Sequence, residues 1–195
     1  MESMKIVILS ILILCFAGFV GCAYIPQEVT LTPETHVIES NTGKGLKVSV
    51  TVKDERPSMS LGFRRSGWGR GSEITTAQNM EELVKREILD GLKKNGFDIT
   101  EYTEAHEREL TVELRLLEYN TSTGMVTGGV HVKGALKAKG KNKGMEYEEI
   151  YRFESEKRVF IVPTAKENER LLTVGFNNLL EKLFSDERLL KFLSN

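Results

Sequence analysis

Cys22 is the residue whose surroundings most clearly indicate a chemical role. It follows the small residue Gly21 and a nearly unbroken apolar run from Ile6 to Phe19, which begins after Lys5. A short charged start, an apolar stretch and a small residue before a cleavage point are typical of a secretory signal peptide. At about 1.5 Å per helical residue the run reaches about 21 Å, shorter than the roughly 30 Å hydrocarbon core of a bilayer. We therefore expect the leader to be removed.

The tetrapeptide Phe19-Val20-Gly21-Cys22 resembles the lipobox of bacterial lipoproteins, with Phe19 where leucine is usual. The resemblance implies cleavage before Cys22 and attachment of a diacylglyceryl group to its sulfur. Each buried lipid CH₂ contributes about 0.8 kcal/mol, so several acyl chains anchor a protein firmly. The only other cysteine, Cys15, lies in the leader. We expect a signal peptide over residues 1–21, a lipidated spacer over 22–44, a single domain over 45–195, and no disulfide or thiol catalysis.

Other residues that could carry chemistry do not form recognisable sets. The three histidines, His36, His106 and His131, lie in separate segments, which argues against a metal site. The glycines between residues 62 and 71 lack the Gly-Lys-Ser/Thr ending of a phosphate loop, and no Gly-x-Ser-x-Gly motif occurs. The sequence therefore predicts a protein that is not an enzyme and carries no cofactor or metal.

Two features near the first predicted strand remain as candidate sites. Asp54 and Arg56 are two residues apart, so in a strand they point to the same side, and we expect a structural ion pair there. Residues 57–78 are rich in Gly, Ser and Arg and are predicted to form a long loop. Trp and Arg dominate protein contact sites, so this loop offers a candidate interaction surface, against the alternative of a disordered loop with no function. Its candidate contact residues are Phe63, Arg64, Arg65, Trp68 and Arg70.

Alternating apolar residues predict strands at 46–52, 110–116, 130–138 and 145–153, the last three as an antiparallel meander. Asn79 and Thr164 can cap two amphipathic helices, and a short helix follows Ser185. We predict an α+β fold of order β-α-β-β-β-α-α, with a four-stranded, mostly antiparallel sheet and two main helices on one face. Val29 and Leu31 in the spacer alternate with threonines, so an additional edge strand there is an open alternative.

This pattern resembles the YajG-type family of bacterial lipoproteins. The likeness rests on three parts of the chain. They are Cys22-Ala23-Tyr24-Ile25-Pro26 with Leu31-Thr32-Pro33, Val48 to Val52 with Asp54 and Arg56, and the helix containing Asn178-Leu179-Leu180 followed by Ser185 to Phe192. The resemblance implies a periplasm-facing lipoprotein of unknown function with no catalytic residues. A formal net charge of −1 argues against nucleic-acid binding.

Two functions fit these expectations. The first is a non-catalytic envelope accessory that binds another envelope protein. The alternative is a carrier of a small ligand or lipid in the space between sheet and helices. The position after the cysteine is Ala23 rather than the aspartate that would suggest retention in the inner membrane, so we expect an outer-membrane anchor facing the periplasm.

Overall fold

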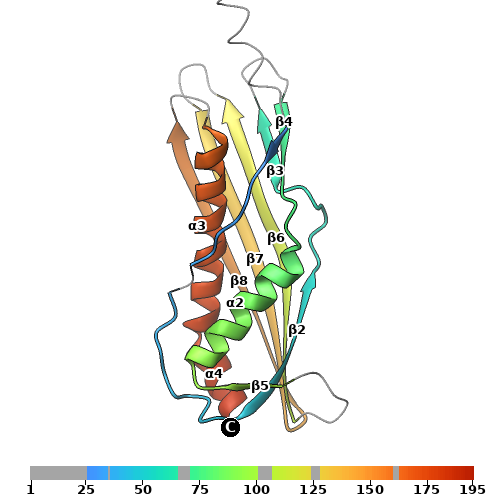
Figure 1. The fold of residues 1–195 in the computed structure, drawn as a ribbon, viewed down its shortest axis with the longest axis vertical. Helices are drawn as coiled ribbons and strands as arrows, with labels where there is room; N and C mark the ends of the chain where they lie inside the picture. The colour runs from blue at the N-terminus through green and yellow to red at the C-terminus, as the bar shows by residue number, and fades with distance from the viewer. Residues whose placement is uncertain (1–25, 35, 66–70, 101–106, 124–127, 160–162) are drawn as a thin grey trace, which may run out of the picture.

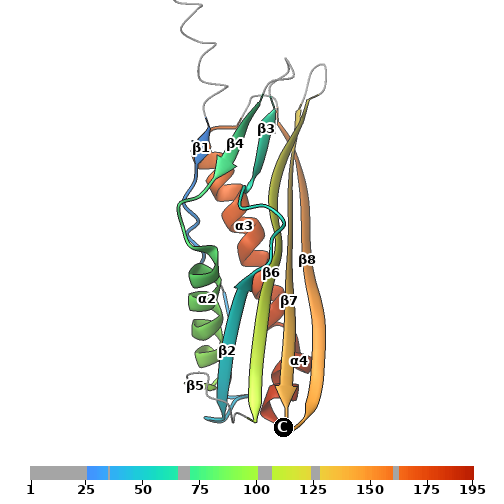
Figure 2. The same cartoon turned by 90° about the vertical axis from the view of Figure 1, so that its right-hand side faces the viewer.

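The computed structural model describes residues 26–34, 36–65, 71–100, 107–123, 128–159 and 163–195. These residues form an elongated α+β body in which an eight-stranded mixed sheet is covered on one face by helices (Figures 1 and 2). No helix among the described residues is both long and apolar enough to cross a membrane. In chain order the elements are β1 (Gln27–Glu28), β2 (Lys47–Asp54), β3 (Gly62–Arg65), β4 (Gly71–Thr75), α2 (Met80–Lys94), β5 (Asp98–Thr100), β6 (Arg108–Thr123), β7 (Gly128–Asn142), β8 (Met145–Val159), α3 (Ala165–Phe184) and α4 (Glu187–Ser194).

The three long strands form the predicted meander. β6 pairs with β7 and β7 with β8, both antiparallel, and the tight turn between β7 and β8 places Lys143 and Gly144 at positive φ. The other edge of β6 is shared, because β2 pairs with its first half and β3 with its second half, both in parallel. β4 pairs with β3, β1 with β4, and β5 with β2.

The prediction of an α+β fold is confirmed, but the predicted four-stranded, mostly antiparallel sheet is wrong. The sheet has eight strands and is mixed, since β2 runs parallel to β6. The missed strands β1, β3, β4 and β5 are short. Short strands gain their stability from pairing with distant partners rather than from a local pattern, so alternation alone does not reveal them.

The helices follow their sequence signals. The side chain of Asn79 accepts hydrogen bonds from the backbone N–H groups of Glu81 and Glu82 and caps α2. Thr164 caps α3 through the N–H of Glu167. α2 packs on β2, and α3 packs on β7 and β8, so both lie on the same face of the sheet (Figure 2). The core between these layers includes Leu136, Phe176 and Leu179, all fully buried.

The segment predicted as a spacer is packed against the domain from Gln27 onward. Residues 26–34 and 36–46, here called the strap, run beside α3 toward the end of the molecule that holds the C-terminus (Figure 1). Val29 and Leu31 are buried, and the backbone N–H groups of Thr30 and Leu31 donate to Glu169 and Gln78. The compact part of the chain therefore begins well before the boundary expected at residue 45.

Candidate functional site

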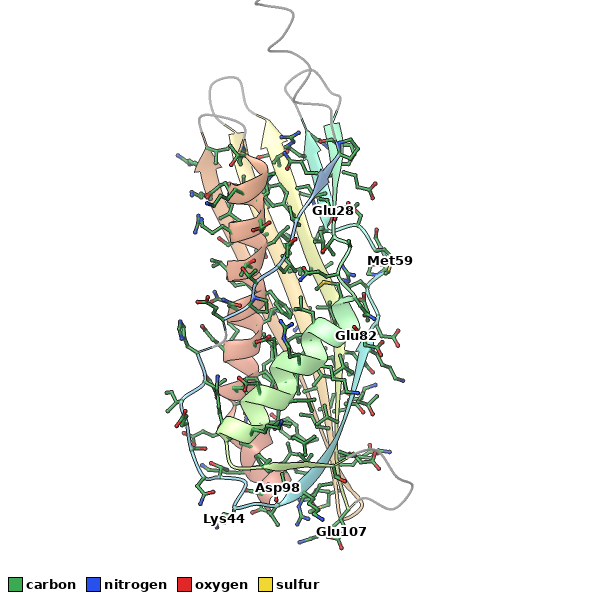
Figure 3. The ribbon with its side chains drawn as sticks, viewed as in Figure 1. Glu28, Lys44, Met59, Glu82, Asp98 and Glu107 are labelled. Carbon is green, nitrogen blue, oxygen red and sulfur yellow. The ribbon has the colours of Figure 1, made fainter. Side chains whose placement is uncertain are left out.

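The edge of β6 carries an interruption between its two parallel partners. β2 is in register with β6 as far as Asp54, opposite Leu114, and β3 begins with Gly62 opposite Tyr119. Residues 55–61 leave the sheet between these points, and Met59 marks the outermost part of their path (Figure 3). β6 itself has a bulge between Leu114 and Leu116, which reverses the facing of the residues that follow.

A cavity of about 400 Å³ occupies this interruption, and we call it the notch. Its lining combines apolar, polar and charged side chains from β3, β4, β6 and the 55–61 segment. The lining residues are Arg56, Pro57, Ser58, Ser60, Gly62, Phe63, Glu73, Leu116, Leu117, Glu118 and Asn120. The volume lies in the range of about 300–1,000 Å³ typical of ligand pockets.

Gly62 allows the chain to re-enter the sheet at this point. Its φ is +136°, and an added Cβ would lie 1.8 Å from the carbonyl oxygen of Tyr119. The backbone N–H of Tyr119 in turn donates to the carbonyl of Leu61 over 2.7 Å. The side of the notch formed by β3 therefore depends on a close backbone contact that only glycine permits.

Asp54 and Arg56 form a bidentate ion pair at the other side of the notch. Arg56 Nε lies 2.8 Å from Asp54 Oδ1, and Nη2 lies 2.7 Å from Oδ2. Burial alone would raise the pKa of Asp54, but the hydrogen bonds and positive charge of Arg56 outweigh burial and lower it. The Arg56 side chain is only 2% exposed, and its Nη1 has no hydrogen-bond partner among the described residues. The geometry thus provides a fixed buried guanidinium with one donor group unused.

The remaining lining is apolar on one side and acidic on another. Phe63 is 40% exposed, a large fraction for a phenylalanine. Leu116 and Leu117 continue the apolar lining along β6, whereas Glu73 and Glu118 contribute carboxylates. Within the described part of the chain, neither glutamate takes part in a salt bridge, although Glu118 lies opposite Lys133 of β7, whose ammonium is paired with Glu154. The notch therefore offers an apolar wall, a buried donor and two carboxylates.

The predicted contact residues of the 57–78 stretch do not form one surface. Phe63, Arg64 and Arg65 belong to β3, so the prediction of a long loop is wrong for them, and their side chains alternate between the two faces of the sheet. Arg64 points into the body, is buried, and donates from Nη2 to Ser72 Oγ over 3.2 Å. Arg65 is exposed, and its backbone N–H donates to Thr121 Oγ1. The other predicted site residues, Trp68, Arg70 and Cys22, lie outside the described residues.

Glu73, Glu118 and Leu116 were not predicted as site residues, because the notch depends on the register of two strands against a third. The sequence carries one signal of the notch. Leu114 and Leu116 continue the alternation of β6, but Leu117 and Tyr119 begin a new apolar phase. Such a shift of phase within a strand indicates a bulge, and bulges often accompany functional sites.

The described histidines do not gather at the notch. His36 lies on the strap, and His131 on β7 has Ser122 Oγ at 3.3 Å and Glu156 Oε1 at 4.0 Å. Searching the described residues for three or more grouped His, Cys, Asp or Glu side chains gives no candidate metal site. His106 lies outside the described residues.

Comparison with known proteins identifies the family. The model of a family described as uncharacterised lipoprotein matches residues 33–194. No curated protein matches the chain in sequence. A crystal structure of a Xanthomonas campestris protein assigned to the DUF330 family model has a similar fold, with 11% identity, 86% of this chain and 95% of that chain covered, and a TM-score of 0.54.

A minor lipoprotein from Acinetobacter baumannii is also similar, with 10% identity, coverage of 71% of this chain and 88% of that chain, and a TM-score of 0.42. The structural likenesses concern the fold alone, whereas the family match covers most of the sequence, including the strap after Thr32, the notch and the C-terminal helices. Because the family model matches most of the chain, the chain belongs to this family of uncharacterised lipoproteins, in agreement with the resemblance to the YajG type.

Proposed function

We propose that this protein is a non-catalytic binding module, anchored through Cys22 to the outer membrane and facing the periplasm, which holds a partner envelope protein at the notch. Membership of a lipoprotein family supports the lipid anchor. The observation that carries the binding role is the notch itself, in which the apolar wall around Phe63 meets a buried, fixed Arg56. Aromatic and arginine side chains of this kind dominate the energetics of protein contacts.

The position of the strap agrees with a short tether. Cys22 is five residues before Gln27 in the sequence, and an extended chain spans at most about 3.6 Å per residue, so the anchor lies within about 18 Å of β1. β1 pairs with the last residues of β4, of which Ile74 lies opposite Gly62, where β3 begins beside the notch. A partner at the notch would therefore approach close to the membrane that holds the lipid.

The alternative of a ligand carrier receives less support. A carrier needs space between the sheet and the helices, but the side chains that border this space, Leu136, Phe176 and Leu179, are packed and fully buried. A side chain at Gly134 would already lie 2.6 Å from Leu179 Cδ1. The close packing between sheet and helices therefore favours a binding module over a ligand carrier.

Site-specific photocrosslinking in cells tests the proposal. Benzoylphenylalanine replaces Phe63 in one strain and Val174 in another; Val174 lies on α3 and is likewise 40% exposed. We expect a discrete crosslinked envelope protein from position 63, identified by mass spectrometry, and none from position 174. The same products from both positions, or no product from position 63, would overturn the proposal.

A further inference from the structure

We infer that the notch binds an extended peptide segment bearing a lysine or arginine, with one of its backbone carbonyls accepting a hydrogen bond from Arg56. This inference rests on the proposed function and names the chemistry of the partner segment. It follows from the shape of the interruption, from the unused donor of Arg56, and from the balance of charge around the notch.

The shape of the interruption suits an extended chain. β2 and β3 lie along the same edge of β6 and run in the same direction, like two parts of one strand separated by a gap. The gap faces β6 residues 115–118, and four extended residues occupy about 13 Å at about 3.3 Å per residue. A short extended segment fits this length, as in binding modes where a peptide adds to a sheet edge.

Arg56 lines the notch, and its Nη1 is a buried donor that still lacks an acceptor among the described residues. A guanidinium only donates hydrogen bonds and stays protonated, so the group that satisfies Nη1 must be an acceptor. The carboxylate of Asp54 already balances the charge of Arg56 through two short hydrogen bonds. A neutral carbonyl therefore suits the position better than a second carboxylate, whose charge would have no counterpart there.

The charge of the notch favours a cation elsewhere in the segment. Asp54 neutralises Arg56, and Lys133, which lies opposite Glu118, is itself paired with Glu154, so Glu73 and Glu118 leave the lining with an excess of negative charge. A lysine or arginine side chain can place its head near these carboxylates while its aliphatic stem covers apolar surface. The half-exposed ring of Phe63 provides that surface and can also attract the cation through its π face.

The test uses the mature lipoprotein purified in detergent and a displayed library of random pentapeptides. We expect the wild-type protein to enrich sequences containing Lys or Arg, and the Glu73→Gln/Glu118→Gln variant to lose that enrichment by at least about tenfold. Both substitutions keep side-chain size at exposed or half-exposed positions, so folding is preserved. A matched control, Glu146→Gln/Glu156→Gln, changes two exposed glutamates of β8 away from the notch and should enrich the same sequences as the wild type.

Enrichment of acidic or uncharged peptides, no enrichment, or identical selection by the Glu73/Glu118 variant would overturn the inference. The peptide selection and the crosslinking experiment can fail independently of each other. A crosslinked partner at position 63 together with failed peptide selection removes only the ligand class. Selective binding of basic peptides without a crosslinked partner in cells removes only the envelope-partner role.

Discussion

A Cβ on Gly62 would lie 1.8 Å from the carbonyl oxygen of Tyr119, so the beginning of β3 and the second half of β6 are in close backbone contact beside the notch. Gly62→Ala must push the strands apart or move β3, and it also places a side chain at a φ of +136°. Overpacking alone typically costs about 1–3 kcal/mol. We expect urea unfolding to show a loss of at least about 2 kcal/mol.

Gly144→Ala is the matched control for this substitution. Gly144 also has a positive φ, of 79°, but an added Cβ meets nothing within 4 Å. Its cost should be limited to the conformational preference, about 1 kcal/mol. Equal losses for the two variants would show that the contact with Tyr119 does not constrain β3.

The strap should contribute to the stability of the domain. The side chain of Leu31 is 1% exposed, and the backbone N–H of Leu31 donates a hydrogen bond to Gln78. Truncation of a buried leucine leaves a cavity, and Leu31→Ala should lower the free energy of unfolding by about 2–5 kcal/mol. Ile38→Ala removes a similar side chain from the same strap where it is 89% exposed, and its effect should stay within about 0.5 kcal/mol. A Leu31 variant as stable as the Ile38 variant would show that the strap is only a spacer.

Asp186 should make the stability of the C-terminal helices depend on pH. Burial would raise its pKa, but hydrogen bonds from the hydroxyls of Tyr147 and Tyr151, and from the first N–H groups of α4, lower it below the ordinary value of 3.8. A lowered pKa in the folded state means that the carboxylate stabilises the fold above pH 3.8 and loses this effect as the pH falls through the folded pKa.

Asp186→Asn should therefore destabilise the protein by about 1–3 kcal/mol at pH 7, because two partly buried tyrosine hydroxyls and a helix cap lose a charged acceptor. Urea unfolding at pH 7 and near pH 2 measures the difference, which should shrink at the lower pH. Glu146→Gln, on the exposed end of β8, serves as the control and should show little effect at either pH. A difference of the same size at both pH values would contradict the role of the ionised carboxylate.

The long elements of this fold were predictable because each carries its own local signal. The meander strands alternate over many residues, and Asn79 and Thr164 cap their helices as their residue types indicate. β3 and β4 escaped prediction because Arg64 occupies an inward position that alternation assigns to an apolar residue. The strap escaped because its hydrogen bonds go to Gln78 and Glu169, which are distant in sequence.

The candidate site was predictable only in pieces. The spacing of Asp54 and Arg56 indicated that they could pair, and Phe63 was named as a contact residue. What joins them is the gap between two strands on one edge of β6, and a single sequence does not contain that register. The acidic lining followed from the same register, because Glu73 reaches the notch only through the pairing of β4 with β3.

The tether should orient the molecule on the membrane. Arg158 and Glu146 are exposed at opposite ends of β8, about 40 Å apart at about 3.3 Å per residue, and Arg158 lies at the end where β7 begins. Arg158→Cys and Glu146→Cys give single labelling sites, since Cys15 is expected to leave with the leader and Cys22 to be acylated.

A fluorophore at position 158 should be quenched strongly by headgroup-labelled lipid in vesicles that carry the mature protein, and one at position 146 only weakly. Similar quenching at the two positions would show that the end of the sheet near β1 is not held closer to the membrane than the opposite end.

The lipid anchor is the claim on which the membrane position and the partner both depend, and intact mass measurement of membrane-extracted protein tests it most directly. We predict a chain that begins at Cys22 and is heavier than its amino-acid sequence by a diacylglyceryl group and an N-acyl chain. Cys22→Ser should lose that added mass and leave the membrane fraction. An unmodified cysteine, or a serine variant that keeps the same mass increment and fractionation, would contradict the account.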